Sequence, residues 1–507
     1  MGRMHAISST AVAVIIAVVV TAIVVGVAAY YLAISSAPAA PATPTTQVVT
    51  KTVTIAQTTT TPVTVTVTAS PTKTTTTTPA MPKSITFYTW WAGLERFAID
   101  ALIGNFTKKY GIEVKKTAVP GGAGVNAKFA ILALIMAGKP PAAFQVHCGP
   151  EMISYFMAAP HKEKDFVDLT SVAKQIDITS TAPGQACMLA GRMYTIPVNL
   201  HRANLIFMNK HVLDKYGIKP PTTLDQLVQA CKTLAAHGKP CMLQAGADLF
   251  TVLHLWEQIF LSVAGPQKFI QFMYGTLSPD DPSIKKATEI FLELSKTFPP
   301  NWMSLDWTSA VDALVKGQGA FHVDGDWVVG LVYNVYPNVV MCPIDNIKPN
   351  CDIIVAPFPG TQGIYNMVID AVAVPHGPEE KAGTLFAKFF ASRDGQKIFN
   401  PLKGSIADYP DIPPDIYPTT IQKWEVKEYK ESKYQVFSLT HGALFSDVWQ
   451  KLLQGAVTLA QTKNTAMWYD TVTKALKTER ELWEKSGLYL GTPEKPFAGY
   501  LPPWAKK

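Results

Sequence analysis

Three strand-like segments that alternate with helical patterns most constrain the fold of this chain. ITFYTWW (85–91), IEVKKTAV (112–119) and AAFQVHCG (142–149) have the composition of strands, and amphipathic helical patterns over 95–111 and 126–139 separate them. Strands that alternate with helices in this order form a parallel sheet with helices on its faces. Ligand-binding groups are then expected at the carboxyl ends of the strands.

Polar and aromatic residues stand at those strand ends. Trp90 and Trp91 close the first pattern, and Gln145 and His147 close the third. Neighbours in an extended chain point to opposite faces, so we expect one tryptophan to pack on the sheet and Trp91 to face a cleft. Gln145 and His147 lie two residues apart and share a face. A buried core histidine is the alternative, but an imidazole, an amide and a glycine at one edge favour a binding site.

The pattern changes after the third strand and later returns. Residues 220–316 are mainly helical, NMVIDAVAVP (366–375) reads as an apolar strand, and the pattern over 378–399 predicts one helix. A chain that leaves a sheet, builds a helical lobe and comes back predicts an α/β protein of two lobes joined by several crossovers. Such an architecture has a cleft between the lobes and closes by a hinge. The predicted lobes are 83–198 with 356–400, and 199–355 with 401–507.

The N-terminal region differs from the rest in composition. Ala11 to Leu32 is an apolar run of 22 residues after Arg3 and His5, long enough to span a bilayer with the N-terminus in the cytoplasm. We expect residues 1–36 to be a signal or membrane anchor; a buried core helix and a cleaved secretory signal are the alternatives. Residues 37–82 contain 19 threonines with scattered prolines, which predicts a disordered, extended stalk open to O-glycosylation.

Charge and cysteine content narrow the function classes. The net charge is +7 without a run of basic residues, so nucleic-acid binding is not indicated. All six cysteines follow the predicted stalk, where an oxidising space favours disulfides, and zinc-type C-x-x-C spacing is absent. Cys231 with Cys241 and Cys342 with Cys351 could close small loops, leaving Cys148 for Cys187, one of several possible connectivities. We expect no metal, no cofactor and no catalytic residues.

Several segments, in order, carry a family resemblance: TWWAG, GGAGVNAK, AGKPPAAFQVHCG, YTIPVNLHRAN, LDWTSAVDALVKGQGAFHVDGDW, PFPGTQG, NPLKGSI and THGA. From about Ile85 to its end, the chain resembles the extracellular solute-binding proteins of sugar ABC transporters. Within this maltodextrin-binding-like class it is most similar to glucose- and galactose-type monosaccharide binders. The resemblance implies a periplasmic-binding-protein-like fold of class II, a hexose of glucose, galactose or mannose type as ligand, and ABC permease subunits as partners. The anchor and stalk resemble membrane-anchored archaeal binding proteins, which implies a monomer on the extracellular face of the cell membrane.

The resemblance places Trp307 as a platform for the C–H face of a sugar, a role that suits a large rigid ring. It also assigns Asp370, Lys403 and His441 to the sugar site. Asp370 interrupts an apolar run, where an unpaired carboxylate would be costly, so sugar hydroxyls and the Lys403 ammonium are its expected partners. We expect Lys403 in a loop.

Two further residues are candidates with open alternatives. Trp327 is either a second aromatic contact or lobe packing, and His201 is either a sugar contact or part of a hinge. Asp324 and Asp326 flank Gly325 and are interpreted as a capped turn.

A surface glycosidase is the competing function, but it needs a pair of acids across a cleft. Glu95, Asp326 and Asp370 show no recognisable pairing of this kind. A sugar sensor or adhesin is the third alternative. Of the three functions, transport is favoured.

Overall fold

The computed structural model describes residues 81–119 and 124–505, which belong to one compact unit. Within these ranges, no helix has the length and apolarity needed to cross a bilayer. The predicted anchor and residues 37–80 of the predicted stalk lie outside the described residues. So do residues 120–123, which include the start of the GGAGVNAK motif.

A five-stranded mixed sheet contains the three strands expected from the alternating pattern. β1 (Ser84–Thr89) lies between β2 (Glu113–Ala118) and β3 (Ala143–His147) and runs parallel to both, as predicted. The sheet continues through β11 (Asp370–Ala373) to β4 (Thr195–Pro197), and β11 is antiparallel to both of its neighbours. Segments more than 200 residues apart in sequence therefore meet at β3 and β11.

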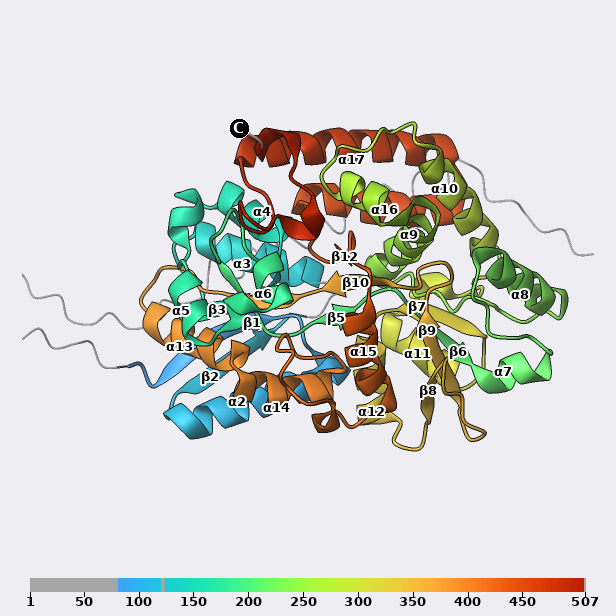
Figure 1. The fold of residues 1–507 in the computed structure, drawn as a ribbon, viewed down its shortest axis with the longest axis horizontal. Helices are drawn as coiled ribbons and strands as arrows, with labels where there is room; N and C mark the ends of the chain where they lie inside the picture. The colour runs from blue at the N-terminus through green and yellow to red at the C-terminus, as the bar shows by residue number, and fades with distance from the viewer. Residues whose placement is uncertain (1–80, 120–123, 506–507) are drawn as a thin grey trace, which may run out of the picture. The chain divides into compact units, whose positions relative to one another are not determined.

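Two smaller sheets complete the strands. β7 (Phe321–Asp324), β6 (Leu205–Asn209), β9 (Ile353–Pro357) and β8 (Met341–Pro343) form one of them in that order. β12 (Tyr434–Phe437), β10 (Ile364–Val368) and β5 (His201–Arg202) form the other. Figure 1 shows the five-stranded sheet on the left, the four-stranded sheet on the right, and β5, β10 and β12 between them.

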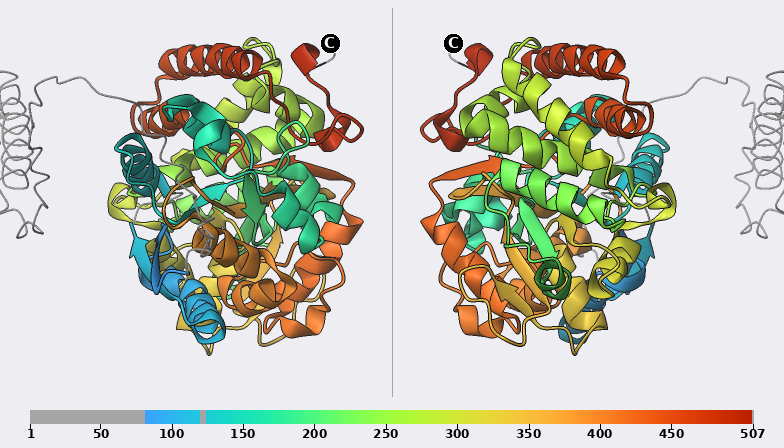
Figure 2. Two further views of the ribbon diagram at one scale, coloured as in Figure 1. Left: turned by 90° about the vertical axis from the view of Figure 1, so that its left-hand side faces the viewer. Right: turned by 90° about the vertical axis from the view of Figure 1, so that its right-hand side faces the viewer.

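Helices cover these sheets. In Figure 1, α16 and α17 lie along the top above the strands, and in the side views of Figure 2 the C-terminal helices stay at the top. The helices are α2 (Arg96–Tyr110), α3 (Val125–Met136), α4 (Pro150–Ala158), α5 (Thr170–Gln175), α6 (Ala182–Ala186), α7 (Lys210–Lys215), α8 (Leu224–Ala236), α9 (Leu249–Met273), α10 (Pro282–Ser295), α11 (Trp307–Val315), α12 (Trp327–Val335), α13 (Glu380–Ala391), α14 (Arg393–Lys403), α15 (Thr420–Glu431), α16 (Ser446–Thr462) and α17 (Thr465–Ser486). Short 3-10 turns include η1 (Gly93–Glu95) directly after β1.

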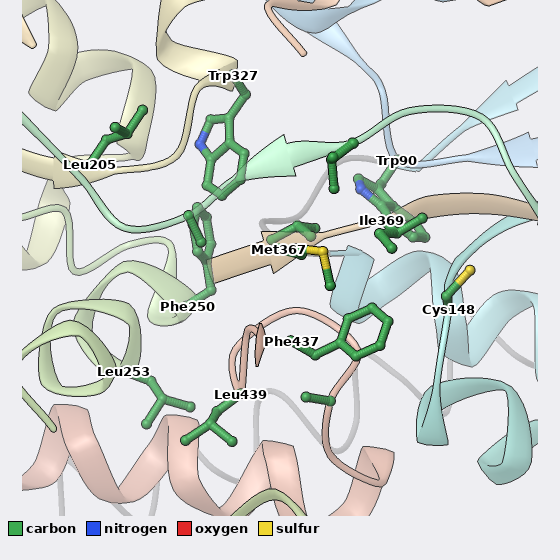
Figure 3. Packing of buried hydrophobic residues seen from close by; sticks show 14 of the residues in the cluster. Trp90, Cys148, Leu205, Phe250, Leu253, Trp327, Met367, Ile369, Phe437 and Leu439 are labelled. Carbon is green, nitrogen blue, oxygen red and sulfur yellow. The ribbon is translucent and has the colours of Figure 1, made fainter. Parts of the chain in front are cut away.

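The apolar strand predicted over 366–375 is divided in the structure. β10 pairs with β5 and β12, whereas β11 pairs with β3 and β4, so the chain passes from one sheet to another at Ile369. Figure 3 shows Met367 and Ile369 within the apolar interior, between Trp90 on one side and Trp327 and Phe250 on the other. Asp370 is therefore the first residue after a change of sheet.

One helix prediction is corrected. The single helix expected over 378–399 is two helices, because Ser392 has an extended backbone and its hydroxyl accepts from the Gly395 N–H as the N-cap of α14. The N-cap of α8 is Thr223, which forms a reciprocal capping box with Gln226.

All six cysteines are paired. The disulfides join Cys148 to Cys187, Cys231 to Cys241 and Cys342 to Cys351, which confirms the suggested connectivity. Cys148 directly follows His147, the last residue of β3, so the Cys148–Cys187 disulfide links the end of this strand covalently to Cys187.

Candidate functional site

A cavity of about 40 Å³ lies where the carboxyl ends of β1 and β3 approach the N-terminal ends of α11 and α12. Every predicted site residue except Gln145 lines it. The lining residues are Trp90, Trp91, Glu95, His147, His201, Phe250, Trp307, Trp327, Val368, Asp370, Lys403 and His441. Larger grooves of about 420 and 240 Å³ lie elsewhere on the surface, but neither combines buried charges with several tryptophans.

Asp370 is held by amides from two other strand ends. Its Oδ1 accepts from Gln145 Nε2 at 2.9 Å and its Oδ2 from Asn199 Nδ2 at 2.9 Å. Its backbone N–H donates to Asn199 Oδ1. Burial alone would raise the pKa of Asp370, but His201, whose Nε2 lies 3.4 Å from Oδ2, and the positive charges around it hold that pKa well below its ordinary value. The cavity therefore contains a fixed carboxylate.

Gln145 stands behind the cavity wall instead of lining it. Its side chain is fully buried, and its Oε1 accepts from the Trp90 N–H at 3.1 Å and from the Thr89 hydroxyl. Gln145 thus positions both Asp370 and the backbone of the tryptophan pair. Asn199, which sequence reasoning did not select, has the same relation to Asp370.

Both neighbouring tryptophans line the cavity, so the expectation that they divide between sheet and cleft is wrong. β1 ends at Thr89, and the alternation of an extended strand does not reach Trp90 and Trp91. The Trp90 ring lies 5.0 Å from the His147 ring, measured between centroids. The Trp91 ring also packs into the core, with its centroid 4.8 Å from that of Phe399.

Two more tryptophans come from helix N-termini. Trp307 is the first residue of α11, and its backbone N–H donates to Asp248 Oδ2 at 2.9 Å. Trp327 is the first residue of α12, and its ring centroid lies 5.0 Å from that of His441 and 5.5 Å from that of His201. The Trp327 ring faces Phe250, a residue without a sequence signal (Figure 3).

Three histidines line the cavity, and the Nδ1 atom of each forms a hydrogen bond with another side chain of the protein. His147 Nδ1 lies 2.8 Å from Glu151 Oε2, and His441 Nδ1 lies 3.1 Å from Ser438 Oγ. His201 Nδ1 bonds to Asp326, which also accepts from the Arg202 N–H.

The ion pair with Asp326 opposes the effect of burial on His201 and raises its pKa. The capped-turn interpretation is wrong for Asp326, because its carboxylate makes no bond to the start of α12 and holds His201 instead.

Lys403 adds a cation to the lining of the cavity. It is the last residue of α14 and not a loop residue as predicted, since Gly404 ends the helix in the left-handed region at φ 92°. Lys403 Nζ lies 3.1 Å from Glu95 Oε1. Burial raises the pKa of Glu95, although Lys403 opposes this shift. Sequence reasoning missed Glu95 as a lining residue; its position just after a strand end was the available signal.

The chain matches known proteins over most of its length. The family model described as "Bacterial extracellular solute-binding protein" matches residues 92–397. The glucose-binding protein GlcS of Saccharolobus solfataricus is 35% identical over 442 residues, covering 83% of this chain and 79% of that protein. The xylose/arabinose-binding protein XacG of Haloferax volcanii is 29% identical, covering 64% and 69%.

Solved structures agree in fold at lower sequence identity. Maltose-bound MalE3 of T. maritima has a TM-score of 0.61 and 18% identity, covering 78% of this chain and 99% of that chain. The bacterial solute receptor AcbH, described as exclusive for β-D-galactopyranose, has a TM-score of 0.62 and 16% identity, covering 80% and 99%.

Proposed function

Because this chain belongs to the bacterial extracellular solute-binding protein family, we propose that it captures one glucose-type hexose in the cavity and delivers it to an ABC permease. The observation that carries the proposal is the convergence of Asp370, Lys403, three histidines and several tryptophan rings, all from separate elements, on one cavity. No covalent step is part of this role, so the protein acts as a binder and not as an enzyme.

The chemistry of the cavity suits a hexose. Tryptophan rings offer apolar faces to sugar C–H groups, and the charged and imidazole groups bond to hydroxyls. Each hydroxyl left unpaired after burial costs about 1–3 kcal/mol, which is how such a site distinguishes epimers. The glucose-binding relative supports a hexose, while the pentose-binding relative shows that related proteins differ in cargo.

We expect the two predicted lobes, 83–198 with 356–400 and 199–355 with 401–507, to open and close around the sugar. A cavity of about 40 Å³ is far below the roughly 300–1,000 Å³ of ordinary ligand pockets, so admission of a hexose requires opening. The chain passes between sheets at 198–200 and at 368–370. At the first of these crossovers, the backbones of Leu200 and Ile406 exchange two hydrogen bonds. These segments are the proposed hinge crossovers. A ligand that contacts both sides favours the closed form by its differential affinity.

The proposed location is the outer face of the cell membrane. Three disulfides agree with an oxidising compartment. The apolar run Ala11 to Leu32 would anchor the protein, and residues 37–82 would give the binding domain reach toward its permease.

Isothermal calorimetry on the full chain in detergent tests the proposal with glucose, galactose, mannose, maltose and trehalose. We expect one-to-one binding of a monosaccharide and at least about a tenfold loss of affinity in Trp307→Ala, which removes an aromatic platform. Trp504→Ala, at a half-buried tryptophan that bonds to Leu488 outside the cavity, is the control and should bind as the unmodified protein does. Absence of heat with every sugar would contradict the proposal, and heat that continues as sugar is consumed would indicate a glycosidase.

A further inference from the structure

His441 lies in the turn between β12 and α16 and is fixed from behind. Its side chain lines the cavity and is 4% exposed. Among the described residues, the hydrogen bond of its ring is to Ser438, whose Oγ lies 3.1 Å from Nδ1. Nε2, on the other side of the ring, is then the nitrogen available to a ligand.

Glu257 of α9 organises this turn. Its carboxylate is fully buried and accepts four hydrogen bonds: from Ser438 Oγ at 3.1 Å, from the Leu439 N–H at 2.9 Å, from the Thr440 N–H at 3.0 Å and from Asn366 Nδ2 at 2.8 Å. A serine hydroxyl has one hydrogen, and Ser438 gives it to Glu257. Ser438 Oγ can therefore only accept from His441, so the proton of the ring is on Nδ1.

The surroundings of His441 also favour the neutral form of its ring. Burial lowers the pKa of its imidazole well below the ordinary value, and the positive charges nearby act in the same direction. The groups that face it come from several elements: His254 of α9, His147 of β3, His201 of β5 and Lys128 of α3. A neutral ring with its proton on Nδ1 has a bare Nε2, which is a hydrogen-bond acceptor.

We propose that Glu257, acting through Ser438, is a positioning residue that fixes His441 as a hydrogen-bond acceptor and so makes this part of the cavity select a donor on the ligand. The inference rests on the proposed function for the identity of the ligand. The donor is a sugar hydroxyl or an ammonium group, whereas a fluorine or an ether oxygen at the same place is rejected. A hydroxyl that donates to His441 keeps its oxygen free to accept from another group.

The first test is independent of any ligand. Nitrogen NMR of the sugar-free full chain, labelled with ¹⁵N-histidine, identifies the His441 signals by their loss in His441→Gln. We expect the proton on Nδ1 and no protonation change between about pH 5 and 8. In Glu257→Gln the new amide donates to Ser438, whose hydroxyl turns to His441 and moves the ring proton to Nε2. Ser438→Ala, a milder change that keeps the carboxylate and its backbone bonds, should give a mixture of tautomers.

Glu479→Gln is the matched control for the NMR test. Glu479 is also a buried acidic side chain that accepts a backbone N–H, from Phe445, and among the described residues it has no hydrogen bond to Ser438. We expect this variant to leave the His441 signals unchanged. A proton on Nε2 in the unmodified protein, or an unchanged tautomer in both Glu257→Gln and Ser438→Ala, would overturn the inference.

The second test measures selectivity by calorimetry with a series of monofluorinated glucoses, in which one hydroxyl at a time becomes an acceptor only. We expect one analogue to bind the unmodified protein at least about tenfold more weakly than glucose and to lose most of this penalty in Ser438→Ala. Penalties that are identical in both proteins at every position would contradict the inference. A protein that binds no sugar would contradict the proposed function, while the sugar-free spectrum still decides the role of Glu257.

Discussion

At the scale of single residues, the interior contains carboxylates in opposite states. Asp370 is surrounded by donors and cations and keeps its charge, as described above. Asp408 is equally buried, but its Oδ2 accepts from Gln396 Nε2 at 2.7 Å and its Oδ1 has no hydrogen-bond partner among the described residues. Burial raises the pKa of Asp408 from 3.8 to about 8. The neighbours of a carboxylate, and not its depth, decide whether it is charged.

This difference predicts how stability depends on pH. Asp408 stays protonated in the folded protein but ionises in the unfolded chain above pH 3.8, so its contribution to stability falls as pH rises from there to about 8. Asp408→Asn removes this loss. We expect the variant to be more stable than the unmodified protein by at least about 1 kcal/mol at pH 8, with the difference shrinking toward pH 4.

Urea denaturation at several pH values measures the effect. Asp411→Asn serves as the control, because Asp411 is exposed and its pKa is lowered by Arg393. An Asp408→Asn variant whose advantage does not depend on pH would refute the assignment.

At the scale of elements, two glycines let α12 and α14 meet closely beside the cavity. A Cβ at Gly404 would lie 2.4 Å from the Gly330 N, and a Cβ at Gly330 would lie 2.3 Å from the Lys403 carbonyl oxygen. Both contacts are to backbone, which cannot move aside alone. The position of Lys403 in the cavity thus depends on the absence of side chains at this crossing.

Gly404→Ala should therefore lower the free energy of unfolding more than the same substitution does at an ordinary glycine that ends a helix. The added methyl group pushes α14 from α12, and we expect a loss of about 1–3 kcal/mol in unfolding free energy together with weaker sugar binding. Gly487→Ala is the control, since Gly487 also ends a helix at positive φ but no atom of the described part of the chain lies within 4 Å of the added Cβ. Denaturation and calorimetry measure both effects. Equal losses in the two variants would show that only the backbone conformation matters.

Local sequence patterns predicted which helices and strands exist better than they predicted the residues at which these elements end. The first strands and helices were predicted within a few residues because apolar periodicity and Gly111 mark them in the sequence. The division at Ile369 was not predictable, because both halves of 366–375 are equally apolar and only tertiary pairing assigns them to different sheets. Among site residues, the strand-end positions and the resemblance together selected most of the residues that line the cavity, whereas Asn199, Glu151 and Glu257 lie behind those residues and have no distinctive local pattern.

At the scale of the whole molecule, the cavity is assembled from segments between Trp90 and His441, and the crossovers join its two sides. If closure depends on hinges at 198–200 and 368–370, sugar should slow amide hydrogen exchange in those segments and around Trp90. α8 lies away from the cavity and should exchange at the same rate with and without sugar. Mass spectrometry of the full chain measures these rates. Slowing that is uniform over the chain, or absent at both crossovers, would contradict a hinge.

The buried pair of His201 and Asp326 sets a limit on how heat-resistant this protein can become while it still binds. Replacing a buried ion pair by apolar residues of similar volume is often neutral or stabilises a fold by about 1–4 kcal/mol. A library selected only for survival at high temperature should therefore lose these charges early. Under the proposed function, its survivors would be well folded but would bind sugar more weakly, so thermostability engineering of this chain has to select for binding in every round.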